Sequence, residues 1–576
     1  MLRGRRSPHF HPDRDPLPLH AEILCGGNVR SCQGMTSRSK KLVYALLSSL
    51  VFTACTKTPA DNPSAGSSVQ MMELNKDLKS VYIDDAYRNT YEIFPYSFCD
   101  TDGDGIGDLK GIISKLDYIQ DMGFTALWLT PVHPSGTYHK YDVDDYYAID
   151  PQFGTMEDYE TLIEECGKRN IRVIMDLVLN HTSTDNEWFQ KAHEYLKELP
   201  PDWEPSVDYC KYFDYYNFTR EAKEGWAPLS DTNWYYEARF WDGMPDLNLN
   251  SSFVRQEITD IMKFWLDKGV SGFRLDAVTS FYTGDPDQNT EFLRWLVSTG
   301  KSLKKDCYFV GEAWTGRDEI AKYYESGIDS LFNFPFADQS GILCNVMRGS
   351  FGAEDYVNAQ IKADQVYRER NSSYVDAPFY TNHDMGRSAG YYALDEGPVT
   401  KMAYALSILM SGNTYVYYGE ELGMKGSGRD ENKRAPMYWS TDASSEGMCR
   451  GPEGMDEIKM KFPSFEEQKT DDLSMWNYFR QALKIRNAFP SIARGEITLY
   501  DECSDEELAV FAKDDGVHEP VLLVINVTDQ TETADLSSLG EFTKLSAVLN
   551  TSEEKIVYDH GTMTMPPFSI AVLTGE

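Results

Sequence analysis

Short apolar runs alternate with amphipathic, helix-like stretches along the middle of this chain. Each run is four to six residues long and rich in aliphatic and aromatic side chains, which is typical of strands buried in a parallel sheet. Eight such alternations predict an α/β fold, a (β/α)8 TIM barrel. The predicted strands are Tyr91–Tyr96, Ala126–Thr130, Arg172–Leu177, Ser271–Leu275, Tyr308–Gly311, Ser330–Phe334, Pro378–Thr381 and Thr414–Tyr418.

The longest gap between predicted strands indicates an inserted domain after the third strand. Residues 181–245 are dense in Trp, Tyr and Asp and have no clear helical period. The aromatic residues of this segment either line sugar subsites or form the core of a small domain. An amphipathic helix is then predicted over Ser251–Gly269.

The pattern changes again near the C-terminus. The last helix of the predicted barrel covers about Ser474–Asn487, and short strands separated by turns follow Pro490. We therefore expect a catalytic barrel over residues 80–490 and a C-terminal β-sandwich over 491–576.

The N-terminal region has the pattern of an export signal. Basic residues precede Leu42–Ala54, an apolar run that suits a signal peptide and is too short to span a bilayer. Phe52-Thr53-Ala54-Cys55 resembles a bacterial lipoprotein box, which predicts a signal peptide over 35–54 and lipidation of Cys55. The alternative is a secreted protein cleaved near Ala54.

These features predict where the protein is located. A tether over residues 55–79 would hold the folded part outside the cytoplasm, anchored by lipid to the cell membrane or outer membrane. Residues 1–34 have no export character, and we expect them to be a spurious extension.

The net charge and the cysteine content exclude some classes of partner and of site. The net charge of −36 argues against nucleic acid as a partner and suits a neutral ligand. Seven of the ten cysteines follow Cys55, with wide spacing and no CxxC pair. This arrangement is neither a disulfide framework nor a zinc site, so free thiols are expected.

Three acids end predicted strands: Asp276, Glu312 and Asp384. In a TIM barrel, the carboxyl ends of the strands carry the chemistry. Convergent carboxylates, with Arg274 and His383 close by in sequence, are what cleavage of a glycosidic bond requires.

Four motifs occur in order along the predicted strands: Asp176–His181, Gly272–Asp276, Val310–Trp314 and Tyr380–Asp384. Together they resemble the alpha-amylase family, glycoside hydrolase family 13. The resemblance implies a retaining mechanism through a covalent glycosyl–enzyme intermediate. It also implies that Asp276 is the nucleophile, Glu312 the acid/base and Asp384 the third acid, which holds sugar hydroxyls.

The physical chemistry of retention agrees with these roles. A retaining pair of carboxyl groups lies about 5–5.5 Å apart, which neighbouring strands can supply. Arg274 would keep Asp276 ionised, and Trp314 or other acids would keep Glu312 protonated.

Further contacts with substrate follow from the resemblance. They are expected from Tyr141, which would stack beneath the cleaved sugar, and from Asp142, His181, Arg274, Asn382 and His383. Family members that release single glucose units usually have Asp where this chain has Tyr138, which favours an open cleft and internal cleavage. The sequence of the Gly243–Asn248 segment is intermediate between the forms typical of alpha-1,6-cleaving glucosidases and of neopullulanases. This segment therefore leaves bond specificity open.

An acidic loop follows the first predicted strand. Its spacing lets five groups surround one hard cation, and the family carries calcium in this loop. The predicted ligands are Asp100, Asp102, Asp104, the Ile106 carbonyl and Asp108. The loop is not an EF-hand, because its twelfth position is Gly111, and the alternative is a solvated acidic turn. A second calcium found in the family usually has a His ligand at the position where this chain has Ser280. The sequence therefore leaves a second calcium site open.

The sequence therefore predicts a monomeric, calcium-containing hydrolase of internal alpha-1,4 bonds in starch or maltodextrin. The alternatives within the family are an alpha-glucosidase, a neopullulanase or cyclomaltodextrinase, and a 4-alpha-glucanotransferase. The alternative from another class is a surface glycan-binding protein.

Overall fold

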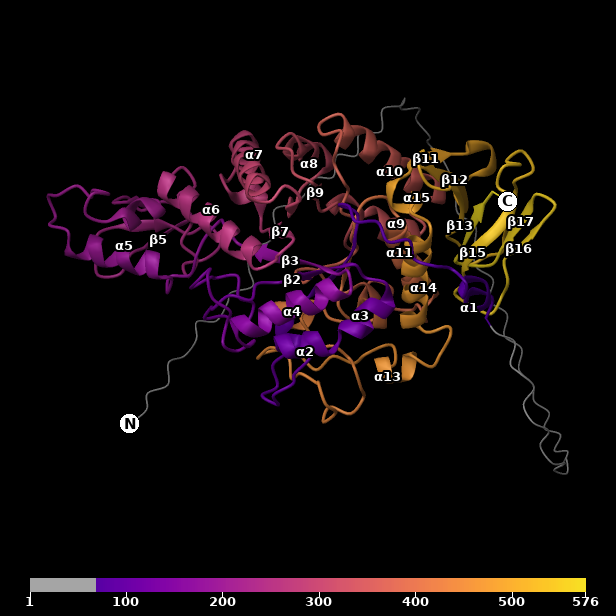
Figure 1. Cartoon of the computed structure of the whole chain (residues 1–576), viewed down its shortest axis with the longest axis horizontal. Coiled ribbons are helices and arrows are strands. Elements are labelled where there is room, and N and C mark those ends of the chain that lie inside the picture. Colours follow the sequence, from indigo (N-terminus) through magenta and orange to yellow (C-terminus); the bar gives the residue numbers. More distant parts are fainter. Residues whose placement is uncertain (1–68, 576) are drawn as a thin grey trace, which may run out of the picture. The chain divides into compact units, whose positions relative to one another are not determined.

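The computed structural model of the chain describes residues 69–575 (Figure 1). The predicted extension, the signal peptide and Cys55 lie outside the described residues. Within the described range, no helix combines the length and the apolar character needed to cross a membrane. All seven cysteines in that range are free thiols, as expected.

A curled parallel sheet forms the centre of the molecule, in the order β10-β1-β2-β3-β7-β8-β9. Residues 377–379 connect the two edges of this sheet. Ala377 forms a parallel β-bridge with Phe332, next to β9, and Phe379 forms a parallel β-bridge with Tyr415 of β10. The predicted run at 378–381 therefore closes the TIM barrel without forming a regular strand. The other seven are β1 (Asn89–Ile93), β2 (Ala126–Leu129), β3 (Arg172–Leu177), β7 (Gly272–Leu275), β8 (Tyr308–Gly311), β9 (Ser330–Leu331) and β10 (Thr414–Tyr417).

Helices connect these strands and surround the sheet. The predicted helix after the insertion is α6 (Ser252–Asp267), where the Ser251 hydroxyl caps the N-terminus by accepting from the Phe253 and Val254 N–H groups. Its predicted apolar face is buried. The other helices of this region are α2 (Leu109–Ser114), α3 (Leu116–Met122), α4 (Met156–Lys168), α7 (Pro286–Leu303), α8 (Arg317–Tyr324), α9 (Ile342–Met347), α10 (Ala353–Arg368), α11 (Pro398–Ile408), α12 (Asp430–Lys433), α13 (Phe465–Gln468), α14 (Met475–Ala488) and α15 (Ser491–Arg494).

The segment after β3 contains a helix that the sequence interpretation missed. The helix α5 (Glu187–Glu198) is capped by Asn186, whose side chain accepts from the Trp188 N–H at 2.8 Å. Only Phe189, Ala192 and Leu196 are buried along it, a stripe too sparse to stand out among the surrounding aromatic residues. An antiparallel sheet completes the segment, which is drawn in magenta in Figure 1: β4 (Phe218–Thr219), β6 (Tyr235–Glu237) and β5 (Trp226–Pro228).

The aromatic residues of this segment divide into a buried set, as expected for the core of a small domain, and an exposed set. Tyr215 and Trp234 are buried in its core, whereas Trp203, Tyr209 and Trp241 are about half-exposed or more.

Two antiparallel sheets follow α15, consistent with the predicted β-sandwich. The larger has the order β11-β12-β13-β18-β15, and the smaller β14-β17-β16. The helix α1 (Gln70–Asn75), within the predicted tether, packs on β15 through two hydrogen bonds between Asn75 and Val548. The strands are β11 (Glu496–Leu499), β12 (Leu508–Asp514), β13 (Val521–Asn526), β14 (Glu532–Asp535), β15 (Lys544–Leu549), β16 (Val557–Asp559), β17 (Thr562–Met565) and β18 (Ser569–Thr574).

Candidate active site

Two neighbouring strands place Asp276 and Glu312 side by side. Leu275 at the end of β7 pairs with Gly311 at the end of β8, so the next residue of each strand emerges at the same edge. The strands approach closely because β7 begins with glycine: a Cβ at Gly272 would lie 2.1 Å from the Tyr308 carbonyl oxygen. Both carboxylates are about nine-tenths buried.

The guanidinium of Arg274 links the acids of this edge. Its Nη1 lies 2.9 Å from Asp276 Oδ1 and 3.0 Å from both carboxylate oxygens of Asp176. Its Nη2 donates to Glu312. Arg274 is fully buried, so three carboxyl groups share one cation in a medium that screens charge weakly.

The protonation states of the acids are separated by their surroundings. Burial raises the pKa of Glu312 to about 7, and the negative charges of Asp276 and Asp384 add to this while Arg274 opposes it. The expected neighbour Trp314 instead stacks on Phe334, with ring centroids 5.1 Å apart. Burial and the other acids, rather than this indole ring, therefore favour the protonated form of Glu312.

Asp384 lies between two cations. Its Oδ2 is 3.1 Å from His383 Nε2 and its Oδ1 is 2.7 Å from Arg434 Nη2. Burial opposes ionisation, but His383 and Arg434 outweigh it and hold the pKa of Asp384 well below its usual range. Asp384 is therefore a carboxylate at neutral pH.

His383 joins Asp384 to a second buried network. Its Nδ1 is 2.7 Å from Glu92 Oε1 on β1, and its Nε2 is 2.7 Å from the Tyr141 hydroxyl. Burial disfavours the imidazolium, yet Asp384 and Glu92 raise the pKa of His383 to about 10. The Tyr141 hydroxyl in turn donates to Asp176 at 3.0 Å. The Tyr141 and His383 rings stack, with centroids 5.4 Å apart.

Tyr138 lies beside this cluster through Arg434. The Arg434 Nη1 donates to the Tyr138 hydroxyl at 2.8 Å, while Nη2 of the same guanidinium holds Asp384. Burial raises the pKa of Tyr138 to about 12, so it remains a neutral phenol.

The remaining predicted site residues have different surroundings. His181 is buried, and neither of its ring nitrogens has a hydrogen-bond partner within the described part of the chain, so its hydrogen-bonding capacity is unused there. Asn382 accepts from the Asp384 N–H at 2.9 Å and orders that turn. Asp142 accepts from the Ser135 hydroxyl at 2.6 Å, so it orders the loop before Tyr141.

The backbone after Asp276 is strained. Ala277 has a φ of +36°, a left-handed conformation that a residue with a Cβ rarely adopts. The Asn180 side-chain amide holds this turn by donating to the carbonyls of Asp276 at 3.1 Å and Ala277 at 3.2 Å. Asn180 thus positions the carboxylate of Asp276 through the backbone.

Three residues of the site were not predicted from the sequence. Asp176 opens a motif noted there, but its contact with Arg274 depends on the pairing of β3 with β7. Glu92 is the single acid inside β1, which is itself a signal of a buried role. Arg434 lies outside the motifs identified in the sequence, and only the fold brings it to Asp384.

The acidic loop brings together three of its five predicted ligands. Carboxylate oxygens of Asp100, Asp102 and Asp108 lie within 4.8 Å of one another. The carboxylate of Asp104 is outside this group and accepts from the Ile106 N–H at 2.7 Å. Three convergent hard oxygen donors fit a calcium ion, although Asp100 also accepts from the Gly103 and Gly105 N–H groups.

Comparison with known proteins identifies the family. The model of the alpha-amylase catalytic domain matches residues 92–495. Alpha-amylase 3 of Dictyoglomus thermophilum is 38% identical over 71% of this chain and 79% of its own length. Glucan 1,6-alpha-glucosidase of Streptococcus pneumoniae is 30% identical over 81% of this chain and 95% of its own length.

Solved structures agree with this assignment. Eubacterium rectale Amy13B superimposes with a TM-score of 0.87 and 46% identity, covering 88% of this chain and 99% of its own. The barrel, the acids at its carboxyl edge and these similarities together show that the chain is a glycoside hydrolase of the alpha-amylase family.

Proposed function

We propose that this protein cleaves internal alpha-1,4 bonds of starch or maltodextrin with retention of anomeric configuration. The observation that carries the proposal is the Arg274 guanidinium between Asp276 and Glu312. Its Nη1 donates to Asp276 at 2.9 Å, while burial favours protonation of Glu312. A retaining glycosidase needs this division of roles.

In the proposed first step, Glu312 donates its proton to the glycosidic oxygen as the bond to the leaving sugar breaks. Asp276 attacks the anomeric carbon from the opposite face and forms a glycosyl ester. In the second step, the Glu312 carboxylate takes a proton from water. The resulting hydroxide equivalent displaces Asp276 and restores both groups.

The cationic side of the site would bind the sugar whose bond is cleaved. Asp384, fixed by His383 and Arg434, would accept hydrogen bonds from two ring hydroxyls. His181, whose ring nitrogens are buried and unpaired among the described residues, would donate to a third. Such contacts favour the distorted ring if they strengthen towards the transition state.

The choice of internal alpha-1,4 bonds rests on two supports. Relatives at 38% and 46% identity are named alpha-amylase and Amy13B. At Tyr138, the chain presents a neutral phenol on Arg434. The family resemblance implies an Asp at this position in members that release single glucose units.

A second candidate is cleavage of alpha-1,6 bonds. It is supported by the 30% identity to a glucan 1,6-alpha-glucosidase over most of both chains. Early products from maltoheptaose and from isomaltoheptaose distinguish the two. We expect a spread of short maltodextrins from the first substrate and little turnover of the second. Glucose as the sole early product would instead indicate exo action, and products longer than maltoheptaose would indicate transfer.

Calcium and a lipid anchor complete the proposal. Asp100, Asp102 and Asp108 would hold calcium, which would stiffen the loop that leads from β1. The lipoprotein box supports attachment at Cys55 and an extracytoplasmic location. Cell fractionation tests the anchor: the parent should remain with membranes, and Cys55→Ala should be released. A parent protein found only in the soluble fraction would contradict it.

A further inference from the structure

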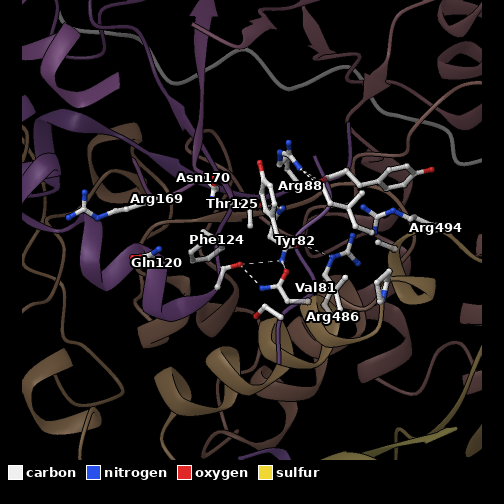
Figure 2. A pocket seen from close by; sticks show the side chains of 18 residues that line it. Val81, Tyr82, Arg88, Gln120, Phe124, Thr125, Arg169, Asn170, Arg486 and Arg494 are labelled. Carbon is white, nitrogen blue, oxygen red and sulfur yellow. Dashed lines mark hydrogen bonds between the residues drawn. The ribbon is translucent and has the colours of Figure 1, made fainter. Parts of the chain in front are cut away.

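A cavity of about 230 Å³ lies at the end of the barrel opposite the acids (Figure 2). Asn89 begins β1, Thr125 directly precedes β2, and Asn170 precedes β3 by one residue, so the cavity adjoins the amino ends of these strands. Residues 80–83 form another wall, attached by a hydrogen bond from the Val81 N–H to the Asn487 carbonyl at 2.8 Å. Because the catalytic acids lie at the carboxyl ends of the strands, this cavity has no role in catalysis.

All the described charged residues that line this cavity are cationic. Four arginines contribute to it, Arg88, Arg169, Arg486 and Arg494, and no Asp or Glu does among the described residues that line it. The whole chain carries a net charge of −36, so a cluster of cations is against the trend of its composition. A concave surface lined by one sign of charge attracts ions of the other sign.

Arg486 has no acidic partner in the described part of the chain. Its side chain is buried, and all three of its guanidinium nitrogens donate to neutral oxygens: Asn89 Oδ1 at 2.7 Å, the Ile408 carbonyl at 2.8 Å, the Met410 carbonyl at 2.5 Å and the Gly412 carbonyl. Burial, with the neighbouring Arg494 adding to it, lowers the pKa of Arg486 to about 9. The positive charge is therefore solvated by dipoles alone, which is costly in a buried site.

Arg88 is also incompletely satisfied. It is 7% exposed, and its Nε is buried without a hydrogen-bond partner among the described residues. Its Nη2 lies 2.8 Å from Asp84, but the same carboxylate also serves Arg172 at 2.7 Å. Burial and the charge of Arg172 lower the pKa of Arg88.

Arg169 is paired with Asp117 and Glu165, each at 2.8 Å, so it needs no further counter-charge. Near the other arginines, Asp85 is shared in the same way as Asp84. Asp85 lies 3.0 Å from Arg494 and 3.9 Å from Arg88. Arg494 also stacks on the Tyr87 ring at 4.7 Å. Two carboxylates, Asp84 and Asp85, thus face more guanidinium groups than they can neutralise.

We propose that this cavity binds a small oxyanion, with Arg88 and Arg494 as the recognition groups and the unneutralised charge of the buried Arg486 adding to the attraction. Planar guanidinium groups match the oxygen geometry of phosphate, sulfate and carboxylate. A water occupies about 30 Å³ in the liquid, so the cavity has room for an inorganic phosphate or a short dicarboxylate. A bound anion supplies the missing counter-charge and stabilises the folded state without touching the catalytic edge.

Calorimetric titration of the purified chain with inorganic phosphate, at constant ionic strength, tests this proposal. Parallel titrations use sulfate, succinate and, as a neutral control, succinamide. We expect saturable binding of one phosphate or succinate per chain, a higher thermal midpoint in its presence, and an unchanged rate of glucan hydrolysis. Tighter binding of succinate than of phosphate would support the same site with a carboxylate ligand.

Two variants and a control locate the site. Arg494→Met should weaken binding at least tenfold, and Arg88→Lys should do so because lysine keeps the charge but loses Nε and the planar fork. Arg370→Met, which removes an exposed arginine paired with Glu325, should bind like the parent. Circular dichroism checks folding; if Arg88→Lys fails to fold, the partly exposed Arg494 decides. Absence of saturable anion binding, or unchanged binding by Arg494→Met, would overturn the proposal. Because catalysis is not involved, this outcome is independent of the proposed function.

Discussion

At the scale of single residues, the site depends on one buried cation, Arg274, shared among Asp176, Asp276 and Glu312. Asp276→Asn removes the proposed nucleophile and keeps its volume. We expect kcat to fall by several orders of magnitude in steady-state assays, with binding of maltodextrin retained. Asp145→Asn, on an exposed loop, is the control. An Asp276→Asn variant with near-parental turnover would reject the assignment.

The pH profile reports on Glu312. Its pKa of about 7 belongs to the acid that must be protonated for the first step, so activity is present below that value and is lost as pH rises through it. We expect the alkaline limb of kcat/KM to have an apparent pKa near 7. A limb that persists unchanged in Glu312→Gln, after correction for its lower rate, would assign the titration to another group.

Tyr138 is the residue that we expect to favour internal cleavage over release of single glucose units. In Tyr138→Asp, the new carboxylate would compete with Asp384 for Arg434 and add a negative charge beside the site. We expect a larger share of glucose among the products of maltoheptaose. Tyr138→Phe, which removes the hydroxyl and keeps the ring, should retain the parental product spread. Identical products from all three proteins would show that this position does not set the cleavage pattern.

At the scale of elements, strands were the most predictable part of the chain. Both β3 and β8 have the predicted bounds, because buried parallel strands are continuous apolar runs. The helix α5 was missed, because its narrow buried stripe lies in a segment crowded with aromatic residues. The contacts of Glu92 and Arg434 could not be predicted from the sequence either. They join β1 and the residue that follows α12 to a turn about 50 residues or more away along the chain.

The acidic loop after β1 gives a prediction at this scale. A chelator should lower the thermal midpoint of the parent, and added calcium should restore it, because the ion offsets repulsion among Asp100, Asp102 and Asp108. Asp102→Asn should weaken this response, whereas Asp529→Asn, on an exposed turn of the C-terminal region, should not. A parent protein free of calcium by elemental analysis, with a midpoint insensitive to chelator, would contradict the site.

At the scale of the whole molecule, Lys513 on β12 attaches the C-terminal sheet to the barrel. It is fully buried and donates to the Leu409 carbonyl at 2.8 Å and the Ile492 carbonyl at 2.9 Å. Lys513→Met would leave these carbonyls unpaired, so we expect the free energy of unfolding to fall by about 1–3 kcal/mol. Lys544→Met, on exposed surface of β15, is the matched control. Equal denaturant midpoints for the two variants would show that Lys513 does not stabilise this junction.

The whole molecule also performs the reaction on which the account depends. Proton NMR of the first products released from maltoheptaose, recorded before mutarotation, tests its central claim most directly. Attack by Asp276 followed by attack of water predicts that the alpha-anomer appears first. Initial appearance of the beta-anomer would contradict a retaining mechanism and, with it, the roles proposed for Asp276 and Glu312.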